Sequence, residues 1–189
     1  MPAGDITFRQ VDGEQAAADF GDLRALYSEV YADPPYEWGE DHADLFAERF
    51  EVQRRQEGFA LVEARDGTDL AGMAFGVTLQ PSTPWWNNLT TTLPPEVTVE
   101  RPGRTFALVE MLVRAPWRRR HVAQGMHDLL LHDRPEERAT LTVLPAAAPA
   151  QAAYRKWSWH RVAQKRNPLP GSPLFDVLLR QLPHPGTSS

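Results

Sequence analysis

The residues best suited to chemistry surround one basic turn, Arg118 to Arg120. An apolar run of the strand type, Phe106 to Val113, precedes this turn. After the turn, apolar residues recur at the spacing of one helix face, at Val122, Met126, Leu129 and Leu130. The predicted order is therefore strand, basic turn, helix. Free backbone N–H groups at a helix N-terminus, together with arginine side chains, form a binding site for an anion. The pattern also fits an ordinary strand–helix unit with a solvated basic turn.

Two motifs, in this order, resemble segments of the GNAT N-acyltransferase superfamily. The first, V-R-A-P-W-R-R-R-H-V-A, resembles the pyrophosphate-binding motif, in which Arg/Gln-x-x-Gly-x-Gly/Ala follows a strand and opens a helix. Arg118 takes the Arg/Gln position and Ala123 the final small residue, whereas His121 stands where the family has glycine. The second, A-P-A-Q-A-A-Y-R-K-W-S-W, resembles the Ala-x-x-x-Tyr-x-x-x-Gly-Phe segment. The resemblance extends from Leu61 to Trp159.

The resemblance implies a coenzyme A site at the basic turn, with acetyl-CoA as the donor. Backbone N–H groups of the turn would bind the diphosphate, and the arginine side chains would add charge and forked donors. The pantetheine arm would lie along the end of the preceding strand, where the resemblance implies that neighbouring strands splay. The expected cofactor-binding residues are Met111, Leu112, Val113, Arg118, Arg119, Arg120, His121, Val122, Ala123 and Gln124.

Glu110 is the candidate general base. It is the only acidic residue between Arg101 and His127, and the strand that carries it would border the thioester. An acceptor amine must lose a proton before it attacks, because an alkylammonium with a pKa of ~10 has no lone pair at neutral pH. Glu110 could accept that proton through water. The alternative is a carboxylate on the outer face of the strand, paired with a nearby arginine.

Tyr154 matches the family's tyrosine that protonates the departing thiolate. The alternative is a core aromatic residue capped by a hydrogen bond. Direct acetyl transfer is expected, because the sequence contains no cysteine that could form a thioester with the acetyl group. Ser158 stands at the family's glycine position after this helix, where a left-handed conformation costs a non-glycine residue roughly 1 kcal/mol.

Aromatic residues in two irregular segments could form the acceptor pocket. Acidic residues near the first group, Glu37, Glu40 and Asp41, would attract a cationic acceptor. Aromatic packing that pins the two segments is the alternative. The candidate acceptor-binding residues are Tyr31, Tyr36, Trp38, Trp85 and Trp86.

Hydrophobic patterns predict the elements that position these residues. They indicate strands at 6–11, 59–63, 70–79, 106–113, 139–144, 159–164 and 175–179, and helices at 20–30, from about 41, from 122, and at 145–157. Gly72 and Gly76 suggest a bulge or a close backbone approach. The proline-rich segment 80–104 contains two adjacent tryptophans and is expected to be a folded flap.

This order predicts an α/β fold with a mixed, mostly antiparallel central sheet of about seven strands and helices on both faces. It agrees with the GNAT fold that the resemblance implies. Residues 1–183 would form a single acyltransferase domain, and residues 184–189 a disordered tail.

The composition excludes several classes of protein. A chain of 189 residues, 42% hydrophobic and 24% charged, suits one globular domain with a proper core. No apolar run is long enough to cross a membrane, and the first residues lack the regions of a signal peptide. We therefore expect a cytoplasmic protein without a membrane partner, as a monomer or homodimer. With no cysteine and scattered histidines, no metal site is expected.

Charge is unevenly divided along the chain, which bears on its partners. Residues 1–100 carry 19 acidic and 6 basic residues, whereas residues 101–189 carry 6 acidic and 14 basic ones. The first hypothesis is an acetyl-CoA-dependent N-acetyltransferase acting on a primary amine of a small, cationic molecule. The second is a catalytically weak or inactive CoA-binding regulatory module, which is suggested by His121 in place of the motif's glycine. The third, binding of nucleic acid or an acidic partner, is disfavoured by the net charge of −5.

Overall fold

The computed structural model describes residues 5–168 and 170–183, so the expected tail at 184–189 lies outside the described residues. Hydrogen bonds place the seven strands in the order β1-β2-β3-β4-β5-β7-β6. The strands are β1 (Ile6–Val11), β2 (Ala60–Asp66), β3 (Asp69–Thr78), β4 (Thr105–Val113), β5 (Arg138–Val143), β6 (His160–Arg166) and β7 (Leu174–Gln181). β4 and β5 pair in parallel, whereas β1–β2, β2–β3, β5–β7 and β6–β7 pair antiparallel. The predicted α/β fold with a mixed, mostly antiparallel sheet is confirmed.

The longer helices occur in the predicted order. The structure also contains short helical elements that the hydrophobic pattern did not predict. They are α1 (Gly13–Ala18), α2 (Phe20–Tyr31), α3 (Glu40–Gln53), α4 (Pro95–Thr98), α5 (Val122–Leu131) and α6 (Ala148–Lys156), with the 3₁₀ turn η1 (Ala115–Trp117). α1, α4 and η1 were not predicted, since each spans six residues or fewer. The last helix was expected from Pro145 but begins at Ala148.

The chain divides into two compact units. One comprises the residues up to Val77 together with Leu108–His132, and the other comprises Thr78–Ala107 together with the residues from Asp133 on. β4 begins in the second unit and continues into the first.

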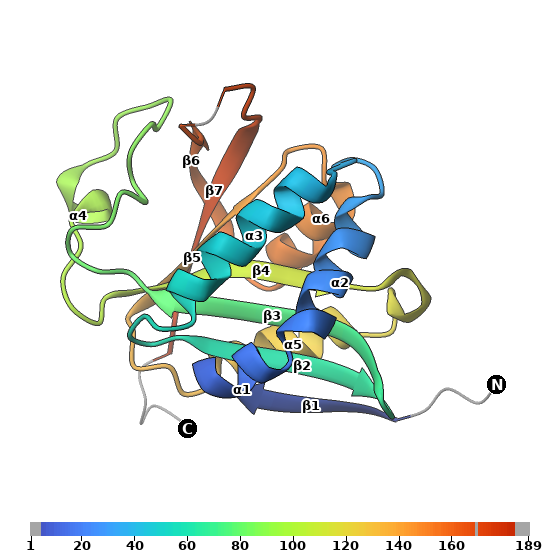
Figure 1. Cartoon of the computed structure of the whole chain (residues 1–189). Helices are drawn as coiled ribbons and strands as arrows, with labels where there is room; N and C mark the ends of the chain where they lie inside the picture. Colours follow the sequence, from blue (N-terminus) through green and yellow to red (C-terminus); the bar gives the residue numbers. More distant parts are fainter. Residues whose placement is uncertain (1–4, 169, 184–189) are drawn as a thin grey trace. The chain divides into compact units, whose positions relative to one another are not determined.

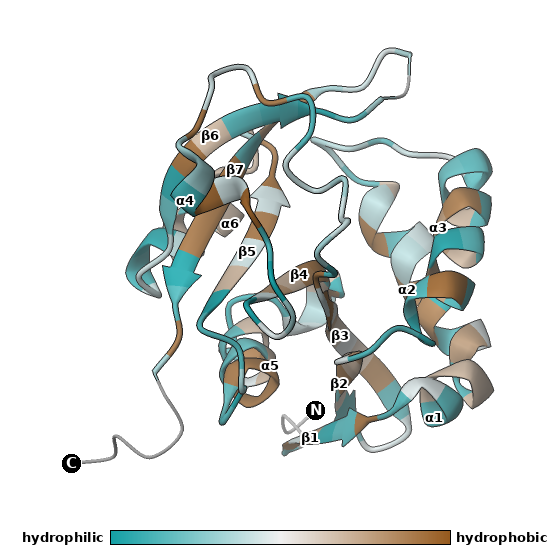
Figure 2. Cartoon of the chain, turned by 90° about the vertical axis from the view of Figure 1, so that its left-hand side faces the viewer, coloured by the Kyte–Doolittle hydropathy of each residue, from teal (hydrophilic) through white to brown (hydrophobic). Residues whose placement is uncertain are grey.

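In the first unit, helices cover both faces of β1, β2 and β3. α2 and α3 lie side by side on one face, and α5 lies on the opposite face (Figures 1 and 2). Large side chains from α2, α3 and β3 fill the space on the first face, and burying each stabilises the fold by roughly 1.5–3 kcal/mol. These fully buried residues include Leu23, Tyr27, Phe46, Phe50, Met73 and Phe75.

On the α5 face, small residues let the backbones approach closely. A β-carbon at Gly72 would lie 2.6 Å from the Leu112 carbonyl oxygen and 3.0 Å from the Met126 methyl group. A β-carbon at Gly125 would overlap the ring of Phe8. The close backbone approach predicted for Gly72 is therefore confirmed, and it brings β3 against the end of β4.

In the second unit, the proline-rich segment 80–104 is a folded flap anchored by a buried ion pair. The Arg138 Nη2 atom donates to Glu100 Oε1 at 2.9 Å, and the Trp86 indole N–H donates to the same oxygen at 2.8 Å. Arg138 Nε also donates to the Thr105 hydroxyl at 2.8 Å. Both charged side chains are almost fully buried, so the anchor fixes the flap to the start of β4 and to β5.

Candidate active site

Glu110 lies on β4 with only 7% of its surface exposed. The hydroxyl of Tyr31, on α2, donates a hydrogen bond of 2.6 Å to Glu110 Oε2. The guanidinium Nη2 of Arg49, on α3, lies 3.8 Å from Glu110 Oε1. The carboxylate therefore points toward α2 and α3, into the packed side of the strand, and the sequence alone could not establish this direction.

Burial dominates the ionisation of Glu110. Removal from water raises the pKa of the Glu110 carboxyl above its ordinary value, and this effect exceeds two opposing ones. The Arg49 charge and the Tyr31 hydrogen bond both lower the pKa, because each favours the ionised form. A carboxylate with a raised pKa holds a proton more readily than an exposed one, which suits a general base working near neutral pH.

Three of the five predicted acceptor-binding residues gather beside Glu110 in the first unit. The Tyr31 ring lies 4.7 Å from the Tyr36 ring and 4.5 Å from the Trp38 ring, and the last two rings are 5.1 Å apart. His42 stacks on Trp38 at 4.8 Å. We call these four side chains, Tyr31, Tyr36, Trp38 and His42, the aromatic cluster. They come from α2, the segment 32–39 and the first turn of α3.

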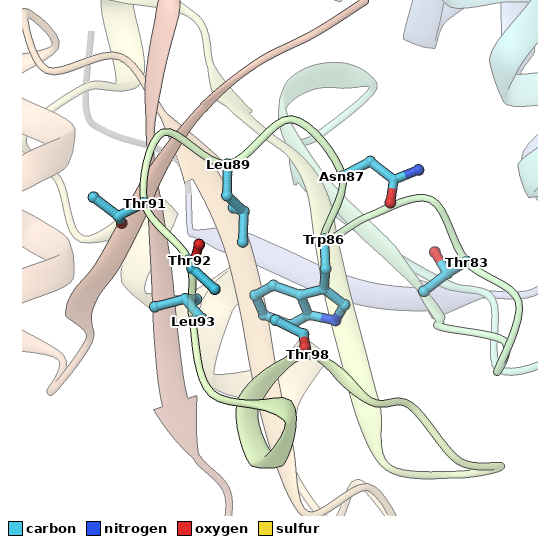
Figure 3. A pocket seen from close by; sticks show the side chains of 8 residues that line it. All are labelled: Thr83, Trp86, Asn87, Leu89, Thr91, Thr92, Leu93 and Thr98. Carbon is cyan, nitrogen blue, oxygen red and sulfur yellow. The ribbon is translucent and has the colours of Figure 1, made fainter.

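The other two predicted acceptor-binding residues, Trp85 and Trp86, lie in the flap of the second unit. Trp86 is buried and packs with Ala163, Val177 and Leu179, and these contacts correspond to the packing alternative. The Trp85 indole N–H donates to the Thr140 hydroxyl at 3.2 Å. Trp86 also lines a hollow of about 440 Å³ within the flap (Figure 3), with Thr83, Asn87, Leu89, Thr91, Thr92, Leu93 and Thr98.

Tyr154 lies near the C-terminal end of α6 and is buried. Its ring packs edge-on against Trp157 and Trp159, with ring centres 5.9 Å away in each case. Ser158 has a φ of 65°, which confirms the left-handed conformation predicted there. The turn lets the Trp159 amide donate to the Tyr154 carbonyl at 3.0 Å, so it holds the end of α6 together.

The basic turn contains two left-handed residues and ends at the N-terminus of α5. Arg119 and His121 have φ values of 61° and 60°, and His121 is the N-cap of α5. The first bond of this helix runs from the Gly125 amide to the His121 carbonyl at 2.9 Å. The preceding amides therefore point out of the helix N-terminus, where they can bind an anion. His121 thus adopts a conformation that glycine adopts more readily than a residue with a β-carbon.

The arginines of the turn differ in what they contact. Arg118 Nε donates to the Val113 carbonyl at 3.1 Å, and its Nη2 lies 3.7 Å from Asp33 Oδ2. Arg119 and Arg120 are exposed. The His121 Nδ1 atom lies 3.3 Å from the Gln124 side-chain oxygen, so this histidine is held at the mouth of the helix. Helix amides, two exposed guanidinium groups and one partly paired guanidinium group together fit a diphosphate.

The strand residues predicted to line the pantetheine arm lie directly before this turn. Leu112 is buried, and Met111 and Val113 are partly exposed. β4 pairs with β5 at Thr105, Phe106 and Ala107, so the described ladder ends before these three residues.

Arg49 is the site residue that sequence reasoning missed. Its position in α3, between the buried Phe46 and Phe50, places it beside the buried face of the helix, but no sequence pattern pairs it with Glu110. The described residues hold no group of three metal-ligating side chains, and no helix among them is long and apolar enough to cross a membrane.

Comparison with known proteins places these features in a family. The model of the acetyltransferase (GNAT) family matches residues 23–159. Two solved structures with a TM-score of 0.65 are the ribosomal-protein-S18-alanine N-acetyltransferase from Escherichia coli and NAA60 from Arabidopsis thaliana in complex with a bisubstrate analogue. The first is 14% identical, with 98% of this chain and 99% of that chain covered, and the second is 13% identical, with 95% and 100% covered.

The PaiA N-acetyltransferase from Thermoplasma acidophilum, solved in complex with coenzyme A, is also similar. Its TM-score is 0.59 and its identity 10%, with 94% of this chain and 99% of that chain covered. No curated protein matches the sequence significantly.

Proposed function

Because the chain belongs to the GNAT acetyltransferase family, we propose that it is an acetyl-CoA-dependent N-acetyltransferase that transfers the acetyl group directly to a primary amine of a small, cationic acceptor. The observation that carries this proposal is the buried Glu110 carboxylate, hydrogen-bonded by Tyr31 at the edge of the aromatic cluster. A group that can accept a proton therefore lies beside aromatic side chains that could bind the acceptor. Acetyl transfer to an amine needs both.

The basic turn supports the choice of cofactor. The N-terminal amides of α5, together with Arg118, Arg119 and Arg120, would hold the diphosphate, and Met111–Val113 would lie along the pantetheine arm. Acetyl-CoA supplies an activated acetyl thioester when bound. The PaiA N-acetyltransferase, which shares this fold, is solved with coenzyme A.

Glu110 would take the proton that the acceptor amine loses. Its Oε2 atom already accepts from Tyr31, so Oε1 is the atom that would receive this proton, directly or through one water. The proton would then pass to solvent, because the carboxylate must be ionised again before the next turnover.

Tyr154 would return a proton at the other end of the reaction. A phenol hydroxyl can donate to the sulfur of the departing thiolate, and the family resemblance places Tyr154 in this role. Burial among Trp157 and Trp159 holds the ring at the end of α6.

The surroundings of the aromatic cluster support a cationic acceptor. Glu37, Glu40 and Asp41 are exposed and lie next to Tyr36, Trp38 and His42 in the chain. Aromatic faces attract a desolvated cation, and carboxylates around them raise its local concentration.

Thiol release measures this function directly. The purified chain is mixed with acetyl-CoA and a panel of amines that contains polyamines, amino acids, aminoglycosides and peptides with free N-termini, and free CoA is followed spectroscopically. We expect a polyvalent amine to accelerate release and Glu110→Gln to abolish most of the acceleration. A chain that binds acetyl-CoA but releases no thiol with any amine would instead be the regulatory CoA-binding module.

A further inference from the structure

We propose that Tyr31 is a positioning residue for acetyl transfer: its hydroxyl holds Oε2 of Glu110 and leaves Oε1 as the atom that receives the acceptor's proton. This inference rests on the proposed role of Glu110 as the base. The sequence suggested Tyr31 only as an acceptor-binding residue, whereas here its role is to position Glu110.

The two side-chain oxygens of Glu110 have different surroundings. Oε2 accepts the Tyr31 hydroxyl at 2.6 Å, a short hydrogen bond of the charge-assisted kind. Oε1 faces the Arg49 guanidinium at 3.8 Å, which is too long for a hydrogen bond. One oxygen is therefore committed within the protein, whereas the other can still accept a proton.

Tyr31 can act only as a donor in this pair. Burial, together with the nearby Glu110 charge, raises the pKa of the Tyr31 phenol well above its ordinary value. The phenol therefore keeps its proton throughout the neutral range and cannot itself serve as the base. A permanent donor to Oε2 stabilises the ionised carboxylate, which opposes the effect of burial.

The Tyr31 ring is fixed by its neighbours and not by the acceptor. Tyr27 packs against it at 4.6 Å, Tyr36 at 4.7 Å and Trp38 at 4.5 Å. The Trp38 amide also donates to the Tyr31 carbonyl at 2.8 Å. The hydroxyl is thus aimed at Glu110 before any substrate enters, and it joins the aromatic cluster to the base.

Among the described residues of the first unit, titratable and charged groups from three segments interact with the Glu110 carboxylate. Tyr27 and Tyr31 come from α2, Tyr36 from the segment after it, and Arg49 from α3. Tyr31 is the one tyrosine among these described residues whose hydroxyl is bonded to the carboxylate. Tyr36 lies in the same cluster without that bond, so it is a matched control for the titration of Glu110.

The first test needs no acceptor. The protein is labelled with ¹³C at the glutamate side-chain carboxyl carbon, the Glu110 signal is assigned by its loss in Glu110→Gln, and its titration is followed by NMR. Tyr31→Phe keeps the ring and removes the hydroxyl, so we expect Glu110 to titrate at higher pH in that variant. Tyr36→Phe should leave the titration of Glu110 close to that of the wild type. An unchanged Glu110 titration in Tyr31→Phe would overturn the proposal.

The second test is a double-mutant cycle in kcat/KM with any amine that supports turnover. We expect Tyr31→Phe to lower kcat/KM about tenfold at pH 7, with a smaller loss at pH 9, because more of Glu110 is ionised there. In the Glu110→Gln background the same change should alter kcat/KM less than twofold. An equal loss in both backgrounds would overturn the proposal and make Tyr31 a contact of the acceptor. If Glu110→Gln itself has no effect on kcat/KM, the proposed base fails, whereas the titration still reports on the hydrogen bond.

Discussion

The guanidinium of Arg118 lies 3.7 Å from the carboxylate of Asp33, so the basic turn contacts the segment that follows α2. Arg118 is predicted to bind the cofactor diphosphate, and Asp33 competes for it. The pair is half exposed on both sides, and such pairs contribute about 0–1 kcal/mol. The contact is therefore weak enough for a phosphate to replace.

Removing this competitor should strengthen cofactor binding. We expect Asp33→Asn to lower the Kd of acetyl-CoA about two- to fivefold at low salt, with the difference shrinking as salt screens the charges. Isothermal titration calorimetry at two ionic strengths measures the effect. Glu48→Gln, an exposed change of the same charge on α3, is the control, and an equal gain there would show that only net charge matters.

The left-handed residues predict a gain in stability. His121 and Ser158 have φ values of 60° and 65°, where a β-carbon costs roughly 1 kcal/mol. His121→Gly and Ser158→Gly should each raise the free energy of unfolding by up to about 1 kcal/mol. Denaturant melts check this. Ala123→Gly, in the first turn of α5, is the matched control and should lower stability by up to about 1 kcal/mol.

His121→Gly also separates two effects on the cofactor. If the His121 side chain obstructs the diphosphate, the glycine variant should bind acetyl-CoA more tightly. If the imidazole instead contributes a contact to the diphosphate, the variant should bind more weakly. We expect the second result, because Arg119 and Arg120 are exposed at the same turn, where their side chains would add charge to the site. Isothermal titration calorimetry of both proteins measures the difference, and tighter binding of the variant would contradict this expectation.

Local sequence patterns predicted most of the helices and strands, but they could not predict contacts between residues far apart in the chain. β1 was predicted at its observed bounds and α2 within one residue, because period-two and helical patterns are local. The hydrogen bond between Tyr31 and Glu110 joins residues 79 positions apart, and no sequence spacing encodes it. The role of Glu110 could be proposed because it is the only acidic residue on the strand before the basic turn, but the direction of its side chain depends on how α2 and α3 pack on the sheet.

Tyr154→Phe tests the proposed acid. The variant keeps the ring contacts with Trp157 and Trp159 and loses only the hydroxyl. We expect kcat to fall at least tenfold, with little change in the Kd of acetyl-CoA, because the hydroxyl acts only as the thiolate leaves. Steady-state kinetics and calorimetry on the same samples measure both quantities. Unchanged turnover with a good acceptor would leave Tyr154 as a packing residue.

The flap anchor predicts a large loss of stability. Glu100→Gln leaves the buried Arg138 guanidinium without its charged partner, and breaking such a pair costs about 3–5 kcal/mol. Thermal unfolding should show a clear drop in Tm. Glu137→Gln removes a partner of Arg101 in a more exposed ion pair and should change the free energy of unfolding by less than about 1 kcal/mol. Equal losses in the two variants would show that burial of the anchor is not what matters.

The raised pKa of Glu110 predicts how stability depends on pH. The folded protein holds this proton more tightly than the unfolded chain, so folding is favoured below the unfolded pKa and loses that contribution as pH rises through the folded value. Glu110→Gln stays neutral throughout and can still accept from the Tyr31 hydroxyl. We therefore expect the variant to gain stability relative to the wild type as pH rises from 4 to 8. Denaturant melts across this range measure the difference. A difference that stays constant with pH would mean that Glu110 ionises in the fold as it does in the unfolded chain, and a difference of the opposite slope would mean that Tyr31 and Arg49 outweigh burial.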